Sequence, residues 1–198
     1  MARTQATDYQ AQRAAILDHA AEAFAAAGYA ACTMADVARV SGASKARLYH
    51  YYASKEAILY DLLDRHTQAL LDIALDVRSA AKREKTKPQD ELKTMIARFL
   101  DAYQTARTRH IALLNDVKFL ATKQRERIIT RERAVVDAFA LALKRAFPKR
   151  ITAASQRALT MLLMGAMNWT FTWLKPDGPM SYADYADEVT RVIVKGLG

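Results

Sequence analysis

Residues 33–55 decide the fold class, and they read Thr-Met-Ala-Asp-Val-Ala-Arg-Val-Ser-Gly-Ala-Ser-Lys-Ala-Arg-Leu-Tyr-His-Tyr-Tyr-Ala-Ser-Lys. The stretch predicts two short helices joined by a tight turn at residues 41–43, with a third helix beginning at Lys55. Thr33 and Ser44 are typical N-cap residues, because a side-chain oxygen accepts a hydrogen bond from the first turn of the following helix. Isolated helices need about 12–15 residues to be stable. Packing against neighbours must therefore hold the helix that follows Ser44.

The same short helix has one inward and one outward face. Leu48 and Tyr52 are four residues apart and are expected to pack against Val37 and Ala38 of the preceding helix. The outward face carries cationic and aromatic side chains, which is typical of a helix that enters the DNA major groove. The predicted DNA-binding residues are Thr33, Ser44, Lys45, Ala46, Arg47, Tyr49, His50, Tyr51 and Lys55.

Their chemistry suits base and phosphate contacts. Lys45 and Arg47 lie at the start of the helix, where recognition helices read bases, and suit guanine O6 and N7. Ala46 is small enough to approach a thymine methyl. Lys55 lies in the first turn of its helix, where the macrodipole disfavours a cation, so we expect a backbone phosphate beside it. The alternative is a solvated helical hairpin whose aromatic residues serve only packing.

The rest of the chain predicts an all-α fold. No stretch alternates like a strand, and the 198 residues include only six glycines and four prolines. Gly28 follows the first helix as a C-terminal stop. The expected helices outside the central motif span residues 9–27, 54–79, 89–107, 109–121, 123–147, 151–174 and 181–195.

Composition limits the possible functions. The net charge is +9, but residues 1–56 carry six basic and five acidic residues, which leaves a surplus of +8 downstream. DNA binding therefore has to depend on where the charges lie. The four histidines show no metal-ligand spacing, and no nucleophile motif or glycine-rich phosphate loop is present, so we expect neither an enzyme nor a metal nor a cofactor. The single Cys32, the absence of a leader and a longest uncharged stretch of 17 residues indicate a cytoplasmic protein that is not in the membrane.

Residues 11–60 resemble the N-terminal domain of tetracycline-repressor-type (TetR family) regulators. The matching residues are Ile16-Leu17, Ala20-Ala21, Phe24, Gly28-Tyr29, Thr33 to Ala38, Gly42 to Lys45, Leu48 to Tyr52, and Ser54 to Glu56. The resemblance implies an all-helical homodimer with DNA-facing side chains at Lys45, Arg47, Tyr49, His50 and Lys55. It divides the chain into a helix-turn-helix DNA-binding domain at 1–56 and an effector-binding and dimerisation domain at 57–198. Position 47 often holds a smaller residue in the family, so Arg47 is expected to alter which bases are read.

Two surfaces are expected in the C-terminal part. The helix predicted at 151–174 is apolar nearly all round, so it is buried on more than one side. With the last helix it supplies a candidate dimer interface, and another of its faces supplies a candidate effector site. For any single residue, ordinary core packing is the better explanation. The interface residues are Leu159, Leu162, Ala166, Trp169, Trp173, Val189 and Ile193; the effector residues are Met161, Met164, Asn168 and Phe171.

Segments after residue 113 and around 168–179 also resemble a TetR subgroup that senses acyl-CoA thioesters. An apolar pocket beside the basic residues of 78–87 and 118–133 suits an acyl chain with a phosphorylated handle, although a solvated basic surface explains those charges too. The sequence therefore predicts a dimeric repressor that binds a palindromic double-stranded operator and is released by a small effector, expected to be an acyl-CoA thioester. The alternative function is sequence-independent, nucleoid-type DNA binding, which the low charge of residues 1–56 disfavours.

Overall fold

The computed structural model describes residues 2–175 and 177–197, with side chains from residue 7 onward. It is all-α, as predicted, and no strand occurs among those residues. The helices are α1 (Ala2–Ala27), α2 (Met34–Val40), α3 (Lys45–Tyr51), α4 (Lys55–Glu84), α5 (Pro88–Thr105), α6 (Arg107–Asp116), the 3₁₀ helix η1 (Val117–Phe119), α7 (Thr122–Ala146), α8 (Ala153–Asn168), α9 (Thr170–Trp173) and α10 (Tyr182–Leu197).

Several helices differ from the predicted ranges. The first begins at Ala2 rather than Tyr9, and α4 continues to Glu84, five residues past the predicted end. Both extensions contain alanine and long-chain residues with high helix propensity. The predicted helix 109–121 is α6 followed by η1, and the predicted helix 151–174 is interrupted at Trp169, which separates α8 from α9.

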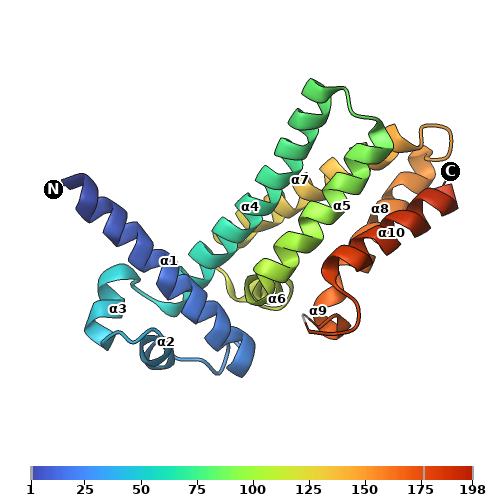
Figure 1. Ribbon diagram of the computed structural model, residues 1–198. Helices are drawn as coiled ribbons and strands as arrows, with labels where there is room; N and C mark the ends of the chain where they lie inside the picture. The colour runs from blue at the N-terminus through green and yellow to red at the C-terminus, as the bar shows by residue number, and fades with distance from the viewer. Residues whose placement is uncertain (1, 176, 198) are drawn as a thin grey trace. The chain divides into compact units, whose positions relative to one another are not determined.

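The chain folds into two compact units. The first comprises the described residues up to His66 together with Thr108–Ile128. Helix α2 packs against both α1 and α3, and Figure 1 shows the three helices together. Its core contains the fully buried side chains of Ile58 and Leu59, and Phe24 contacts Tyr29 edge to face at 5.1 Å between ring centroids. This core holds the short helices α2 and α3 in place.

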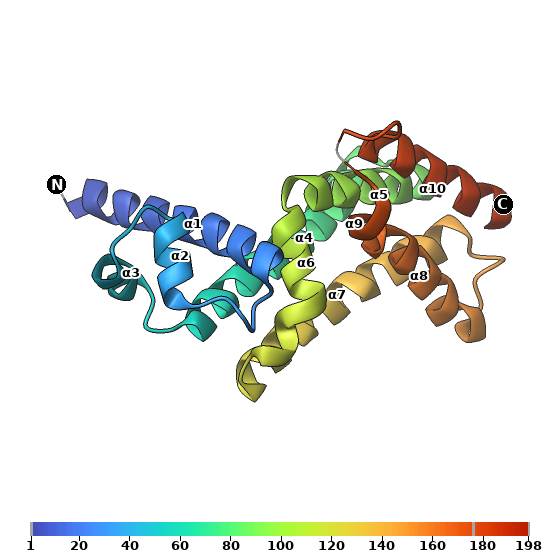
Figure 2. The same ribbon diagram turned by 90° about the horizontal axis from the view of Figure 1, so that it is seen from below.

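The second unit comprises Thr67–Arg107 and the described residues from Ile129 to the C-terminus. Helices α5 and α10 run side by side, and α10 also packs on α8 (Figures 1 and 2). Phe99 of α5 and Phe139 of α7 are both fully buried, with ring centroids 4.8 Å apart. Buried Glu91 in the first turn of α5 forms an ion pair with Arg145 in the last turn of α7 at 2.8 Å. Each charge thus lies at the helix end that favours it.

Candidate nucleic-acid interface

Local hydrogen bonds define both ends of the helix–turn–helix. The Thr33 hydroxyl accepts from the Asp36 backbone N–H at 3.2 Å, and the Asp36 carboxylate accepts from the Thr33 N–H at 3.0 Å, which forms a capping box. The Asp36 carboxylate also accepts from the Thr33 hydroxyl at 2.6 Å, and this bond, with the one from the Thr33 N–H, holds the pKa of Asp36 below its usual value. Ser44 caps α3 by accepting from the Arg47 N–H at 3.1 Å. Gly42 has a φ of +61°, a left-handed conformation that allows the tight turn.

The predicted inward face is confirmed. Val37, Ala38, Leu48 and Tyr52 are buried. The Tyr52 hydroxyl donates to Asp61 of α4 at 2.6 Å, and Asp61 also accepts from Arg13 of α1 at 2.6 Å. This network joins α1, the end of α3 and α4, so it fixes the base on which the outward side chains stand.

The outward face of α3 is divided between two neighbours. Lys45, Ala46, Arg47, Tyr49 and His50 are exposed, whereas Tyr51 is half-buried. Lys45 and Tyr49 border a concave surface of about 630 Å³, which Thr33–Ala35 at the start of α2 and Ser54–Glu56 at the start of α4 also line. Helix N-termini favour anions, so this surface suits a DNA phosphate.

The other side of α3 contacts α1. The Tyr9 ring lies 5.0 Å from Tyr51 and 6.2 Å from His50, centroid to centroid. Arg47 Nη2 donates to Gln12 Oε1 at 3.4 Å. Neither Tyr9 nor Gln12 was predicted from the sequence. The only sequence signal for them is their spacing of three residues, which places them on one face of α1.

Lys55 does not carry an uncompensated positive charge at the start of α4, so that premise of the predicted phosphate contact is wrong. Lys55 Nζ donates to the backbone carbonyls of Tyr29 at 2.8 Å and Cys32 at 2.7 Å, and it lies 4.3 Å from the Tyr29 ring centroid. These carbonyls of the α1–α2 loop already compensate the cation at the start of α4. A phosphate contact by Lys55 stays a prediction, without that argument.

The four predicted effector residues do not share one surface. Met161 is exposed, whereas Met164 is buried in the core. Asn168 Oδ1 accepts from the Tyr103 hydroxyl at 2.8 Å, and the Phe171 carbonyl accepts from Arg107 Nη2 at 2.7 Å. Asn168 and Phe171 therefore contact the last turn of α5 and Arg107, the first residue of α6.

Met161 lines a groove of about 610 Å³ between α7 and α8. Its apolar surface comes from both helices, and Arg133 and Arg157 add cationic groups. Glu132 also lines the groove, and burial raises the pKa of its carboxyl. The full lining is Ile129, Glu132, Arg133, Val136, Asp137, Ala140, Ala153, Gln156, Arg157, Thr160 and Met161. Its size falls within the range of about 300–1,000 Å³ typical of small-molecule sites.

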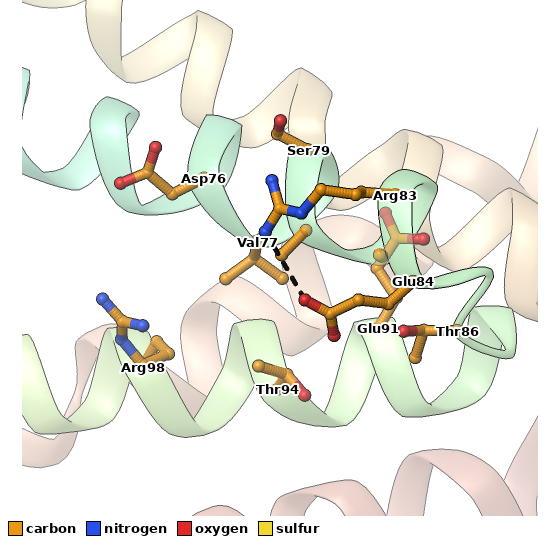
Figure 3. Close-up of a pocket in the computed structure, with 11 residues that line it drawn as sticks. Asp76, Val77, Ser79, Arg83, Glu84, Thr86, Glu91, Thr94 and Arg98 are labelled. Atoms are coloured by element: carbon orange, nitrogen blue, oxygen red, sulfur yellow. Dashed lines mark hydrogen bonds and ion pairs between the residues drawn. The ribbon is translucent and has the colours of Figure 1, made fainter.

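A smaller pocket of about 320 Å³ lies between the end of α4 and the start of α5 (Figure 3). Arg83 forms an ion pair with the adjacent Glu84 at 3.4 Å, and buried Glu91 lies beneath them. Asp76 and Arg98 add one charge of each sign. With three acidic and two basic side chains, this lining does not fit a largely apolar, anionic effector.

The predicted interface residues form an apolar surface on α8, α9 and α10. Leu162 and Trp169 are each 64% exposed, and Trp173 is also exposed. Val189 and Ile193 are largely buried, but they line a shallow apolar groove of about 240 Å³ together with Leu162 and Ala166. Leu159, which lies on α8, is half-buried.

Other kinds of site find little support in the described residues. No three His, Cys, Asp or Glu side chains among them group as metal ligands would. In the part of the chain that the structure describes, no helix is long and apolar enough to cross a membrane.

Capped short helices, a glycine turn and outward cationic and polar side chains define a helix-turn-helix DNA-binding regulator. The family described as "Bacterial regulatory proteins, tetR family" matches residues 16–62, and "Tetracyclin repressor-like, C-terminal domain" matches residues 85–197. The chain belongs to the TetR family. Members of this family are transcriptional regulators rather than enzymes.

Solved structures agree with this assignment. A TetR-family regulator from Bordetella parapertussis is 33% identical with a TM-score of 0.86, and the match covers 92% of this chain and 93% of that one. The regulator PfmR from Thermus thermophilus is 25% identical with a TM-score of 0.81, covering 92% and 98%. AibR, in complex with isovaleryl coenzyme A and operator DNA, is 22% identical with a TM-score of 0.75, covering 90% and 96%. A comparison with curated proteins gave no match.

Proposed function

We propose that this protein is a ligand-responsive transcriptional repressor that binds a palindromic operator as a homodimer and is released by an acyl-CoA thioester. The observation that carries the DNA-binding part is the outward face of α3, where Lys45, Arg47 and Tyr49 are exposed beside the N-termini of α2 and α4. Residues 1–56 would form the DNA-binding domain, and residues 57–198 the effector-binding and dimerisation domain.

Division of labour on the DNA follows from position. Lys45, Ala46 and Arg47 begin the recognition helix and would contact base edges. Thr33 and Ser44 would hold phosphates at helix N-termini, joined by Lys55. Tyr49, His50 and Tyr51 would contact phosphate or base edges from the remaining turn.

Dimerisation is supported by the exposed apolar surface of α8, α9 and α10. Trp169, Trp173 and Leu162 are exposed, and Leu162 borders the apolar groove that α8 forms with α10. Exposed apolar side chains that gather on one face mark interaction sites. A two-fold contact between such faces from two copies would build a four-helix interface. The two recognition helices would then lie about 34–36 Å apart and address an inverted repeat.

The effector part is supported by the groove between α7 and α8. Its apolar lining, with Met161, suits an acyl chain, and Arg133 and Arg157 suit the phosphates of coenzyme A. A protein of the same fold, AibR, has been solved with isovaleryl coenzyme A and operator DNA. Asn168, Phe171 and Met164 do not line this groove, so their part in effector binding stays a prediction.

The DNA-binding proposal is tested by selecting operators from a randomised library and titrating the selected sequence at several salt concentrations. Arg47→Ala should weaken specific binding by about 1–3 kcal/mol and relax one symmetric position. The exposed Arg78, which lies on α4, gives a matched control in Arg78→Ala. Equal affinity for selected and scrambled DNA would favour sequence-independent binding instead.

Calorimetry of acyl-CoA thioesters of increasing chain length, with and without operator, tests the effector. A coupling of about 1–3 kcal/mol would lower operator affinity about 5- to 150-fold, and operator would weaken effector binding by the same factor. Met161→Glu should reduce binding, whereas Met180→Glu, at another exposed methionine, should not. Equal binding of free acids would rule out a phosphate handle, and the absence of any coupling would rule out acyl-CoA thioesters.

A further inference from the structure

Gln12 and Tyr9 of α1 contact one side of the recognition helix α3, the row formed by Arg47, His50 and Tyr51. Gln12 Oε1 accepts a hydrogen bond from Arg47 Nη2 at 3.4 Å. One turn earlier, the Tyr9 ring packs against Tyr51 at 5.0 Å and against His50 at 6.2 Å. The other row, Lys45 and Tyr49, faces the concave surface and has no such support from α1 in the described contacts.

The Gln12 contact matters because Arg47 is an exposed, flexible side chain. Fixing an arginine side chain costs rotamer entropy. A partner that already restricts the guanidinium lowers that cost on binding. The amide oxygen engages one of five guanidinium donors, so the others stay available for a base edge. Because Gln12 is neutral, it orients Arg47 without cancelling the charge that DNA would attract.

We propose that Gln12 is a specificity-determining positioning residue, which acts on DNA through Arg47. It directs the guanidinium from the α1 side of α3 and so selects which base pair Arg47 reaches. Tyr9 supports the same row by limiting the movement of Tyr51 and His50. The inference rests on the proposed operator binding, and it adds α1 to the elements that determine operator sequence.

The test compares Gln12→Ala, Arg47→Ala and the double variant, with Gln10→Ala as control because Gln10 is exposed on the same helix. Each protein is used as the full chain, and its operator preference is measured on a randomised library. Gln12→Ala should relax the same symmetric position as Arg47→Ala and weaken the preferred operator about two- to ten-fold per half-site, as expected for one hydrogen bond. The salt dependence should stay unchanged, because no phosphate contact is lost.

The double variant distinguishes positioning from direct contact. If Gln12 acts through Arg47, its substitution adds no further loss once Arg47 is alanine. Additive losses would overturn the proposal, because Gln12 would then contact DNA itself. An unchanged preference in Gln12→Ala, with a changed one in Arg47→Ala, would overturn it and leave the proposed function standing. If the unmodified protein selects no sequence from the library, both the role of Gln12 and the proposed operator binding are wrong. Equal thermal midpoints for the four variants and the unmodified protein exclude a folding effect.

Discussion

His66 of α4 and His110 of α6 form a buried pair that predicts acid sensitivity of the fold. They are 3% and 2% exposed, and His66 Nε2 lies 3.3 Å from His110 Nδ1. Burial, with the charge of Arg109 as a second cause, lowers the pKa of His66 to about 4. Burial, with His66 as a second cause, lowers the pKa of His110 to about 3.

The direction of the pH effect follows from these values. An unfolded histidine has a pKa of about 6.5, so between that pH and about 4 the unfolded chain binds protons that the folded pair does not. The histidine pair therefore leaves the free energy of unfolding undiminished above about pH 6.5 and lowers it as the pH falls below that value. From pH 7 to pH 5 the loss is about 1.8 kcal/mol for each histidine, or about 3.5 kcal/mol for the pair.

Urea unfolding at pH 7, 6 and 5, at constant ionic strength and protein concentration, measures this loss. The variant His66→Gln/His110→Gln should be less stable at pH 7 but should show a much smaller decline toward pH 5. His50→Gln, which removes an exposed histidine, should keep the full decline. If the double variant declines as steeply as the unmodified protein, the buried pair is not the source of the acid sensitivity.

Three further outcomes are expected. Tyr52→Phe removes the 2.6 Å bond to Asp61 and should lower stability by about 1–2 kcal/mol at pH 7. Burial raises the pKa of Asp61, but this bond and the nearby arginines lower it below its usual value, so the loss should shrink as acid protonates the carboxyl; a pH-independent loss in urea titrations would contradict this. Lys85→Gly should raise the free energy of unfolding, measured in urea, by about 0.5–1 kcal/mol, since Lys85 has a φ of +54° at the end of α4. No gain would argue against backbone strain there. Leu162→Glu should yield monomers in sedimentation, whereas Leu75→Glu, at another exposed leucine, should not; a dimer that tolerates Leu162→Glu would place the interface elsewhere.

Local features of the fold could be predicted from the sequence because the atoms concerned are close in the chain. The caps at Thr33 and Ser44 and the turn at Gly42 each depend on residues within three or four positions. The inward pair Leu48 and Tyr52 follows from helical spacing alone. These signals suffice for the fold class and the recognition helix.

Features that depend on distant residues could not be predicted. The carbonyls that accept from Lys55 lie 23–26 positions earlier, and Gln12 lies 35 positions before Arg47. The interruption of the helix at Trp169 could not be predicted from apolar content, because apolar content does not show where side-chain hydroxyls compete for the backbone carbonyls. There, the hydroxyl of Thr170 donates to the Met167 carbonyl and that of Thr172 to the Trp169 carbonyl.

The carbonyl contacts of Lys55 give it a distinct chemical reactivity. Only a neutral amine with a free lone pair attacks an acylating reagent. Backbone carbonyls surround the Lys55 nitrogen and hold its protons, whereas exposed Lys45, ten residues earlier, is open to the reagent. Mass-spectrometric footprinting should therefore modify Lys45 quickly and Lys55 slowly in the protein without DNA. Operator would then shield Lys45, and the slow labelling of Lys55 would serve as an internal reference for the integrity of the α1–α2 loop.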